Sequence, residues 1–328
     1  MRLRIMFRKI PKFLVMLLLV TFAFTVPFTF SDTASAPYIS GGDVDAPQAL
    51  ESPEPSDVSA TPQSSEIPPD EPDNVGFITV RMDFSDIPRG NLILINNDNR
   101  YDIPDEHGFV AISELKTASY RVTNDRMLLS GTVIEALNEM MDAFNAETGN
   151  DSVAVISAFR DYEKQQETLN EYIALVGYNE AQRWASPPGH SEHQAGLAVD
   201  FGIYSGGAVR TFLGTGVYAW FLQNSHEFGF ILRFPANKTD ITETAHEPWH
   251  FRYVGEPHAY LMYQNDWCLE EYIELLMDYT RDEPYNVLYN GEEYEIYFTW
   301  DLDVYIPFDC EFDISGNNIE GFIVTLKF

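Results

Sequence analysis

Hydrophobic and polar positions follow two different periods along the chain, and these predict both strands and helices. Short apolar or alternating runs predict strands at 77–80, 92–95, 153–159 and 229–234. Apolar residues at helical spacing from Val133 to Phe144, with Gly149 beyond them, predict a helix. Two more helices are expected, one from Asp161 to about Val176 and one from Val217 to Phe228. The mixture predicts an α+β fold.

After about Thr280 the pattern contains only strands, with Asn290-Gly291 as a hairpin turn between two of them. We therefore expect a small β appendage at 281–328. The segment 76–114 is expected to be short and rich in strands, and 115–280 holds the helical periodicity and the candidate chemistry. No residue cluster in the appendage suggests chemistry.

The first 36 residues predict a signal peptide or a membrane anchor. A basic start precedes an apolar run that begins at Phe13, and Ala34-Ser35-Ala36 has the form of a cleavage site, although Pro37 follows it directly. Residues 37–75 are dominated by Pro, Ser and acidic residues, which predicts a disordered linker. We expect the folded part to lie outside the cytoplasm, either secreted or anchored to the membrane.

Composition narrows the class of protein. The 328 residues carry 20 basic and 51 acidic side chains, a net charge of -31, which argues against nucleic acid as a partner. The 45% hydrophobic content is enough for a packed core, and the length favours one catalytic domain with extensions. The two cysteines, Cys268 and Cys310, leave open either one disulfide or two separate thiols.

Four of the seven histidines fall in two short segments, 188–200 and 246–250, close to acidic residues and glycines. Such clustering is typical of a metal site, because zinc is bound by His, Asp and Glu. The second segment spells H-E-x-x-H, the pattern of zinc endopeptidases that place both histidines on one helix. Pro248 disfavours that helix. We therefore set His246 aside and keep Glu247 and His250, which a turn at the proline would bring to one pocket.

The motif Ser191-x-His193-x-x-Gly196-x-Ala198-x-Asp200, followed by Glu247-Pro248-Trp249-His250, resembles the VanY-type D-alanyl-D-alanine carboxypeptidases of the LAS metallopeptidase group. The segment Ser157-Ala158-Phe159-Arg160-Asp161-Tyr162, with Gln165-Gln166 nearby, is similar to a third motif of that family. The resemblance covers roughly residues 115 to 280. It implies a central antiparallel sheet flanked by helices, and cleavage of the terminal bond of peptidoglycan stem peptides.

The resemblance also implies roles for individual residues. One zinc ion would be bound by His193, Asp200 and His250, with Glu247 as the catalytic base. Three protein ligands leave a fourth position for water, which agrees with this assignment. Arg160 would contact the substrate and assist catalysis. The remaining candidates for substrate binding are Ser191, Gln166 and Trp249, of which Trp249 is also a packing residue.

The spacing from His193 to Asp200 would point the two side chains to opposite faces of a straight strand, so we expect a bend at Gly196. Three alternatives stay open: an L,D-carboxypeptidase acting on tetrapeptide stems, an H-E-x-x-H endopeptidase, and a wall-binding module without catalysis. Complete candidate ligands and a base argue against the last. A monomer is expected.

Overall fold

The computed structural model describes residues 76–102 and 108–328. The predicted signal or anchor at 1–36 and the linker at 37–75 lie outside these residues. Within the described part of the chain, no helix is long and apolar enough to cross a membrane.

A central sheet carries the middle of the chain. Its strands lie in the order β3 (Arg121–Val122), β5 (Val153–Ser157), β6 (Ala198–Ser205), β9 (His250–Tyr253) and β8 (Phe230–Leu232), with β7 (Ala208–Thr211) also paired with β6. Neighbouring strands are antiparallel except β3 and β5. A separate two-stranded sheet joins β2 (Phe109–Ala111) to β4 (Leu128–Ser130). With the helices around it, this arrangement confirms the predicted α+β class with a central, mainly antiparallel sheet.

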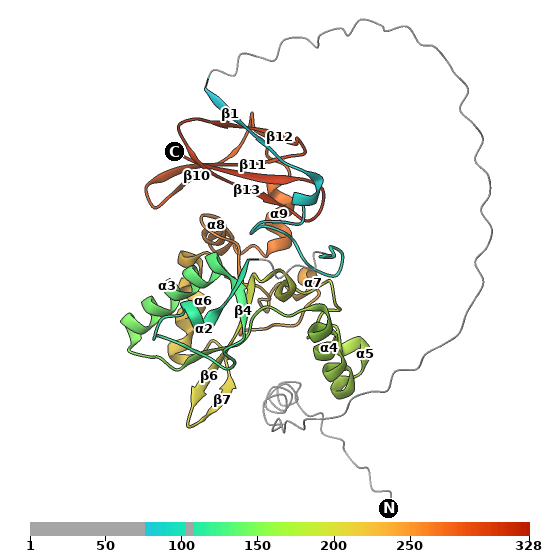
Figure 1. The fold of residues 1–328 in the computed structure, drawn as a ribbon, viewed down its shortest axis with the longest axis vertical. Coiled ribbons are helices and arrows are strands. Elements are labelled where there is room, and N and C mark those ends of the chain that lie inside the picture. Colours follow the sequence, from blue (N-terminus) through green and yellow to red (C-terminus); the bar gives the residue numbers. More distant parts are fainter. Residues whose placement is uncertain (1–75, 103–107) are drawn as a thin grey trace, which may run out of the picture. The chain divides into compact units, whose positions relative to one another are not determined.

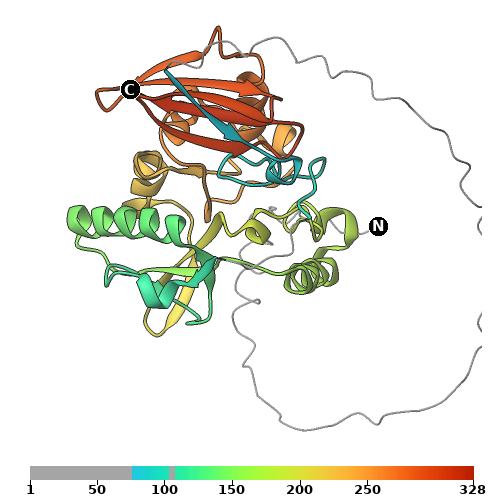
Figure 2. The ribbon, with the colours of Figure 1, turned by 45° about the horizontal axis from the view of Figure 1, so that its top comes forward.

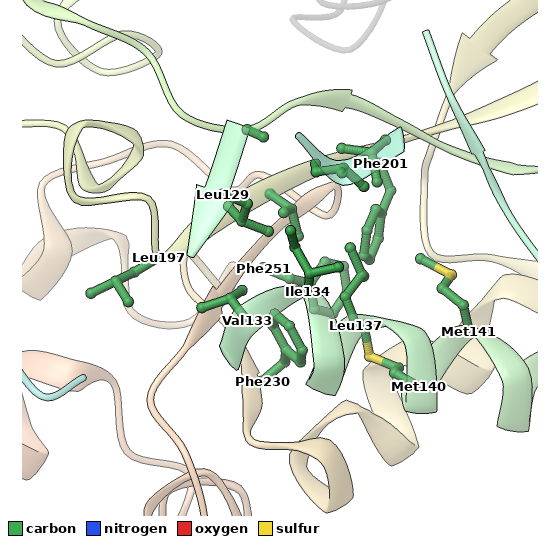
Figure 3. Close-up of a cluster of buried hydrophobic side chains, with 14 of the residues drawn as sticks. Leu129, Val133, Ile134, Leu137, Met140, Met141, Leu197, Phe201, Phe230 and Phe251 are labelled. Atoms are coloured by element: carbon green, nitrogen blue, oxygen red, sulfur yellow. The ribbon is translucent and has the colours of Figure 1, made fainter. Parts of the chain in front are cut away.

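Helix α3 (Gly131–Thr148) covers one face of the central sheet and confirms the predicted apolar stripe (Figure 3). Its fully buried side chains are those of Val133, Ile134, Leu137, Met140, Met141 and Phe144. They pack against alternate residues of β6 and β9, among them Phe201 and Phe251. The helix ends at Gly149, whose φ of 69° is the left-handed conformation that glycine adopts without strain.

Helix α4 (Tyr162–Val176) follows β5 as predicted, and the Asp161 side chain caps it by accepting the amide of Lys164 at 2.7 Å. The single helix expected from Val217 to Phe228 is instead three short pieces: η3 (Gly216–Tyr218), α6 (Ala219–Asn224) and η4 (Ser225–Phe228). The helix is broken between α6 and η4 at Asn224, whose φ of -126° lies outside the helical range. The remaining short helices of this part are α2 (Ile112–Leu115), α5 (Tyr178–Ala181), η2 (Glu192–Ala195) and α7 (Thr239–Thr242).

The C-terminal strands form a second sheet in the order β10 (Tyr285–Tyr289), β11 (Glu292–Thr299), β14 (Phe322–Lys327) and β13 (Glu311–Gly316). The predicted turn at Asn290-Gly291 joins β10 to β11 with φ angles of 53° and 86°, as a two-residue hairpin requires. Strand β1 (Phe77–Arg81) pairs with β12 (Asp303–Pro307), far away in the sequence (Figure 1). In Figure 2 β1, in blue, lies across the orange and red strands.

Two helices, α8 (His258–Asn265) and α9 (Leu269–Leu276), pack against one face of the second sheet. They share a hydrophobic cluster with Ile296, Phe298 and Ile323 of its strands. The opposite face of the sheet, which includes Tyr297 and Val324, packs against β12 and β1. The short helix η1 (Phe84–Asp86) follows β1.

The run Leu92–Ile95, predicted as a strand, is irregular, although all four side chains are buried. Leu92 and Leu94 belong to the cluster around α8 and α9, whereas Ile93 and Ile95 belong to the cluster around α3. The segment therefore lies between two cores. Its backbone groups form hydrogen bonds with side chains and with a loop instead of with a neighbouring strand. The Leu92 amide donates to Ser315 Oγ at 2.9 Å, and Arg252 donates to the Ile93 carbonyl at 2.9 Å. The Leu94 amide donates to the carbonyl of Asn317 in a loop.

Both cysteines are free thiols: Cys268 is buried at the start of α9, and Cys310 is partly buried beside β12. Of the two alternatives that the sequence left open, the structure therefore has two separate thiols and no disulfide between Cys268 and Cys310.

Candidate metal centre and active site

Three elements around β6 bring the candidate metal ligands together. Asp200 on β6 and His250 on β9 are direct cross-strand partners, so their side chains leave the sheet on the same face. His193 is not on the strand but in the short helix η2, which ends at Gly196 with a φ of 64°. The predicted bend is thus present, and it turns His193 back towards Asp200.

The three side chains lie within contact distance of one another. His193 Nε2 is 3.2 Å from Asp200 Oδ2, and His250 Nδ1 is 2.9 Å from Asp200 Oδ1. One ligand atom from each residue lies within 4.8 Å of the others, and all three residues are buried. His193 Nε2 is also buried and makes no hydrogen bond of suitable geometry within the described residues, although Asp200 Oδ2 lies 3.2 Å away. Two imidazole nitrogens and a carboxylate form a ligand set that fits a divalent metal such as zinc. The missing hydrogen bond at His193 Nε2 is consistent with a nitrogen that binds a metal.

The hydrogen bonds of the two histidines determine which ring nitrogen is available. His193 Nδ1 lies 2.6 Å from the Ala158 carbonyl, which can only accept, so Nδ1 carries the proton and Nε2 has a free lone pair. His250 is turned the other way: Nε2 lies 3.4 Å from a carboxylate oxygen of Glu192, and Nδ1 faces Asp200. The ring planes are nearly perpendicular, at 79°.

Glu247 lies in the loop between β8 and β9, where its amide donates to the Phe234 carbonyl. A turn across Pro248 closes with the His250 amide donating to the Glu247 carbonyl, and Glu247 Oε2 is 3.9 Å from His250 Nδ1. The proline turn therefore brings both residues to one pocket, as expected. Residues 246–249 are not helical, and His246 Nδ1 bonds to the Phe234 carbonyl at 2.9 Å. The helical geometry that an H-E-x-x-H endopeptidase needs is absent here.

Arg160 lies shortly after the end of β5, and its amide donates a hydrogen bond to the His193 carbonyl of η2. Its Nε is buried without a hydrogen-bond partner in the described part of the chain. Burial lowers the pKa of Arg160, while the charges of Asp200 and Glu247 oppose that shift. A guanidinium with unused donors beside the metal candidates is suited to bind a carboxylate or a carbonyl oxygen.

A cavity of about 610 Å³ opens over these residues, within the usual size of a small-ligand site. Ser191 and Trp249 line it, and Trp249 also packs in the core around α3. Gln166 does not line it, because its amide lies on the exposed side of α4 and donates to Asn170. Sequence reasoning missed Tyr172, which lines the cavity from the same helix.

Behind the cavity lies a cluster of buried charges that sequence reasoning also missed. Glu192 Oε1 accepts hydrogen bonds from Arg233 Nε at 2.6 Å and from Arg252 Nη1 at 2.8 Å. Arg233 also forms an ion pair with Glu270. Both arginines are fully buried. A signal was available in the sequence, since an arginine between the aromatic residues of a buried strand, as in Phe251-Arg252-Tyr253, requires an anionic partner.

The buried charges shift the pKa values of the site in opposite directions. Burial and the nearby Arg160 lower the pKa of His193 to about 4. Burial also disfavours the charged form of His250, but hydrogen bonds to Asp200 and Glu192 outweigh it and raise its pKa to about 9. Burial raises the pKa of Glu247 to about 8. Perturbed groups that converge on one cavity are typical of an active site.

Comparison with known proteins adds independent evidence. The model of the family VanY, D-alanyl-D-alanine carboxypeptidase, matches residues 126–256. A D-alanyl-D-alanine carboxypeptidase of Enterococcus faecium is 34% identical over 248 residues, which cover 73% of this chain and 75% of the relative. A protein of the same description from Enterococcus faecalis is 44% identical over 146 residues, covering 42% of this chain and 52%, about half, of the relative.

Among solved structures, the vancomycin resistance D,D-dipeptidase VanXYg in complex with a D-Ala-D-Ala phosphinate analogue is similar, with a TM-score of 0.69 and 30% sequence identity. The match covers 77% of this chain and 99% of that chain. Its extent exceeds the 131 residues from 126 to 256 that the family model matches.

Proposed function

The chain belongs to the VanY family of D-alanyl-D-alanine carboxypeptidases and is a peptidase, and we propose that it removes the C-terminal D-alanine of peptidoglycan stem peptides with one zinc ion. The observation that carries the proposal is the convergence of His193, Asp200, His250 and Glu247 in one cavity. His193, Asp200 and His250 are the proposed ligands. The missing hydrogen bond at Nε2 of His193 supports this assignment.

The chain's own residues supply the proton transfer. When bound, zinc lowers the pKa of a coordinated water and polarises a carbonyl group. Glu247 accepts a proton from the attacking water and donates it to the departing amine.

The remaining lining residues bind and orient the substrate. Arg160 binds the terminal carboxylate or the scissile carbonyl oxygen through its unused donors. Ser191 and Trp249 contact the peptide from the cavity wall. We assign no contact to Gln166, since it lies outside the cavity. We favour D,D-cleavage of pentapeptide stems, and the alternative is L,D-cleavage of tetrapeptide stems.

We also propose an extracytoplasmic location, secreted or held at the membrane by the N-terminal segment. The basic start and the apolar run of that segment support it. An exported enzyme would meet peptidoglycan stem peptides where the cell wall is built.

The test is to incubate the full-length chain, loaded with zinc, with a pentapeptide ending in D-Ala-D-Ala and with the corresponding tetrapeptide. We expect mass spectrometry to show loss of one D-alanine from the pentapeptide. Cleavage of the tetrapeptide alone would replace D,D- by L,D-specificity.

Glu247→Gln should lower kcat by roughly 10²- to 10⁴-fold while the zinc content stays the same, because it removes the proton acceptor. Glu243→Gln, an exposed residue of the same loop, is the matched control and should keep full activity. An unchanged rate in Glu247→Gln, or a parent chain that holds no zinc, would refute the proposal.

A further inference from the structure

Glu192 is placed between a proposed metal ligand and two arginines, and each of its oxygens faces a different group. Oε1 accepts both Arg233 and Arg252, whereas Oε2 lies 3.4 Å from Nε2 of His250. Only 3% of the Glu192 surface is exposed. Glu192 is adjacent to His193 in the sequence, but its side chain contacts His250.

The surroundings hold Glu192 in place from several elements. Arg233 follows β8 and forms two hydrogen bonds to Glu270 at the start of α9, at 2.9 and 2.6 Å. Arg252 on β9 donates to the carbonyls of Asn91 and Ile93. Two glutamates and two arginines balance in charge, which is the condition under which buried ions are tolerated.

We propose that Glu192 is a positioning residue for the metal site: it accepts the Nε2 proton of His250 and thereby holds Nδ1 of that ring towards the metal. The inference rests on the proposed zinc-dependent function. A carboxylate behind a ligating imidazole fixes its tautomer and raises its basicity. On the corresponding side of His193, Nδ1 bonds to the backbone carbonyl of Ala158, which a side-chain substitution does not remove. Glu192 supports His250 through a side chain and can therefore be tested by substitution.

A purely structural ion-pair role predicts something different. If Glu192 served only to neutralise the arginines, its removal would destabilise the metal-free fold and leave the affinity for zinc as it is. Glu270 provides the matched comparison, because it pairs with the same Arg233 in the same cluster and makes no contact with His250.

The experiment measures zinc affinity of the full-length chain by competition with a chromophoric chelator, and the thermal unfolding of the metal-free protein. Glu192→Gln should weaken zinc binding by about 10- to 100-fold. Glu270→Gln should keep the parent's affinity while it lowers the unfolding temperature. In protein labelled with ¹⁵N-histidine and loaded with zinc, Glu192→Gln should also change the signal of one Nε2-protonated imidazole.

A second pair of variants covers the case in which the single substitutions do not fold. Glu192→Gln with Arg233→Gln, and Glu270→Gln with Arg233→Gln, both remove one anion and one cation, but only the first removes the carboxylate beside His250. Equal zinc affinities within either matched pair would overturn the proposal. A parent chain that binds zinc yet releases no D-alanine would refute the proposed function instead and leave this comparison valid.

Discussion

The two histidines of the cavity present different ring nitrogens, although both are buried and lie beside the same carboxylate. His193 offers Nε2, because its Nδ1 donates to a backbone carbonyl, and His250 offers Nδ1, because its Nε2 faces Glu192. Asp200 lies between them with one oxygen towards each ring. The donor set is therefore fixed by hydrogen bonds made on the far side of each ring.

Asp200→Ala should abolish stable zinc binding, because it removes one proposed ligand and the partner of both rings. Loss of an outer hydrogen bond already weakens metal sites by about 10- to 100-fold, so loss of a ligand should exceed about 100-fold. His246→Ala is the control and should keep the metal, since His246 bonds to the Phe234 carbonyl instead. Metal analysis after dialysis checks both, and loss of zinc from His246→Ala alone would favour an H-E-x-x-H site.

Single residues were predictable from the sequence where local chemistry constrains them. Pro248 excluded a helix, and the turn that remains brings Glu247 and His250 together. Contacts between distant positions were not predictable in this way. Glu192 of η2 and Arg233, which follows β8, lie 41 residues apart in the sequence, and the tertiary fold places their side chains 2.6 Å from each other.

At the scale of elements, Gly196 determines how η2 joins β6 and hence where His193 lies. Gly196→Ala should destabilise the metal-free chain by about 1–2 kcal/mol through its left-handed backbone and by about 1–3 kcal/mol more through a clash. A Cβ there would lie 2.6 Å from the Phe109 ring. Gly206→Ala has nearly the same φ, 63°, and open space around it, so it should lose only the backbone part.

Urea unfolding of both variants measures the difference. Equal losses would show that the turn accommodates the methyl group without displacing Phe109. Zinc affinity should fall in Gly196→Ala only, since Gly206 lies at the far end of β6, beyond Ser205.

Elements with a strong period were predicted well, and those set by tertiary contacts were not. Helix α3 and the β10–β11 hairpin follow from the apolar stripe and from Asn290-Gly291. Leu92–Ile95 is a short apolar run of the kind that buried strands have, but it lies between two cores. The groups that satisfy its backbone come from distant positions such as Ser315 and Arg252. A one-dimensional pattern does not contain that information.

A buried histidine joins α8, α9 and β14 and should make the fold sensitive to acid. Among the described residues, His258 shares side-chain hydrogen bonds with Tyr272 and Thr325, at 2.8 and 3.1 Å, and burial lowers its pKa to about 3. The unfolded chain takes up a proton near pH 6.5 and the folded chain does not. The free energy of unfolding should therefore fall, by up to about 1.4 kcal/mol per pH unit from this group, as the pH decreases from 6.5 towards 3.

His258→Gln keeps a hydrogen-bonding side chain but removes the titration, so its unfolding free energy should depend less steeply on pH between 6.5 and 4. Chemical denaturation at several pH values gives both slopes. Parallel curves for parent and variant would contradict a neutral, buried His258.

At the scale of the whole molecule, the segment 92–95 couples the central sheet to the C-terminal sheet. Its side chains alternate between the two hydrophobic clusters, and Asn318 of the C-terminal part donates to the Leu94 carbonyl at 2.8 Å. Arg252 of β9 binds the same segment from the other side. The sequence predicted domain boundaries at residues 114 and 280. Whether the parts on either side of each boundary unfold separately stays a prediction, which unfolding experiments can test.

Leu94→Ala should destabilise both sheets together. The substitution opens a cavity in the cluster around α8 and α9, at a cost of about 2–5 kcal/mol. If the shared segment makes the two cores one cooperative unit, native-state hydrogen exchange should show the same loss of protection for the amides of β6 and of β14. Leu288→Ala, exposed on β10, is the control and should change neither. Loss of protection confined to β14 would mean that the C-terminal sheet opens independently of the central sheet.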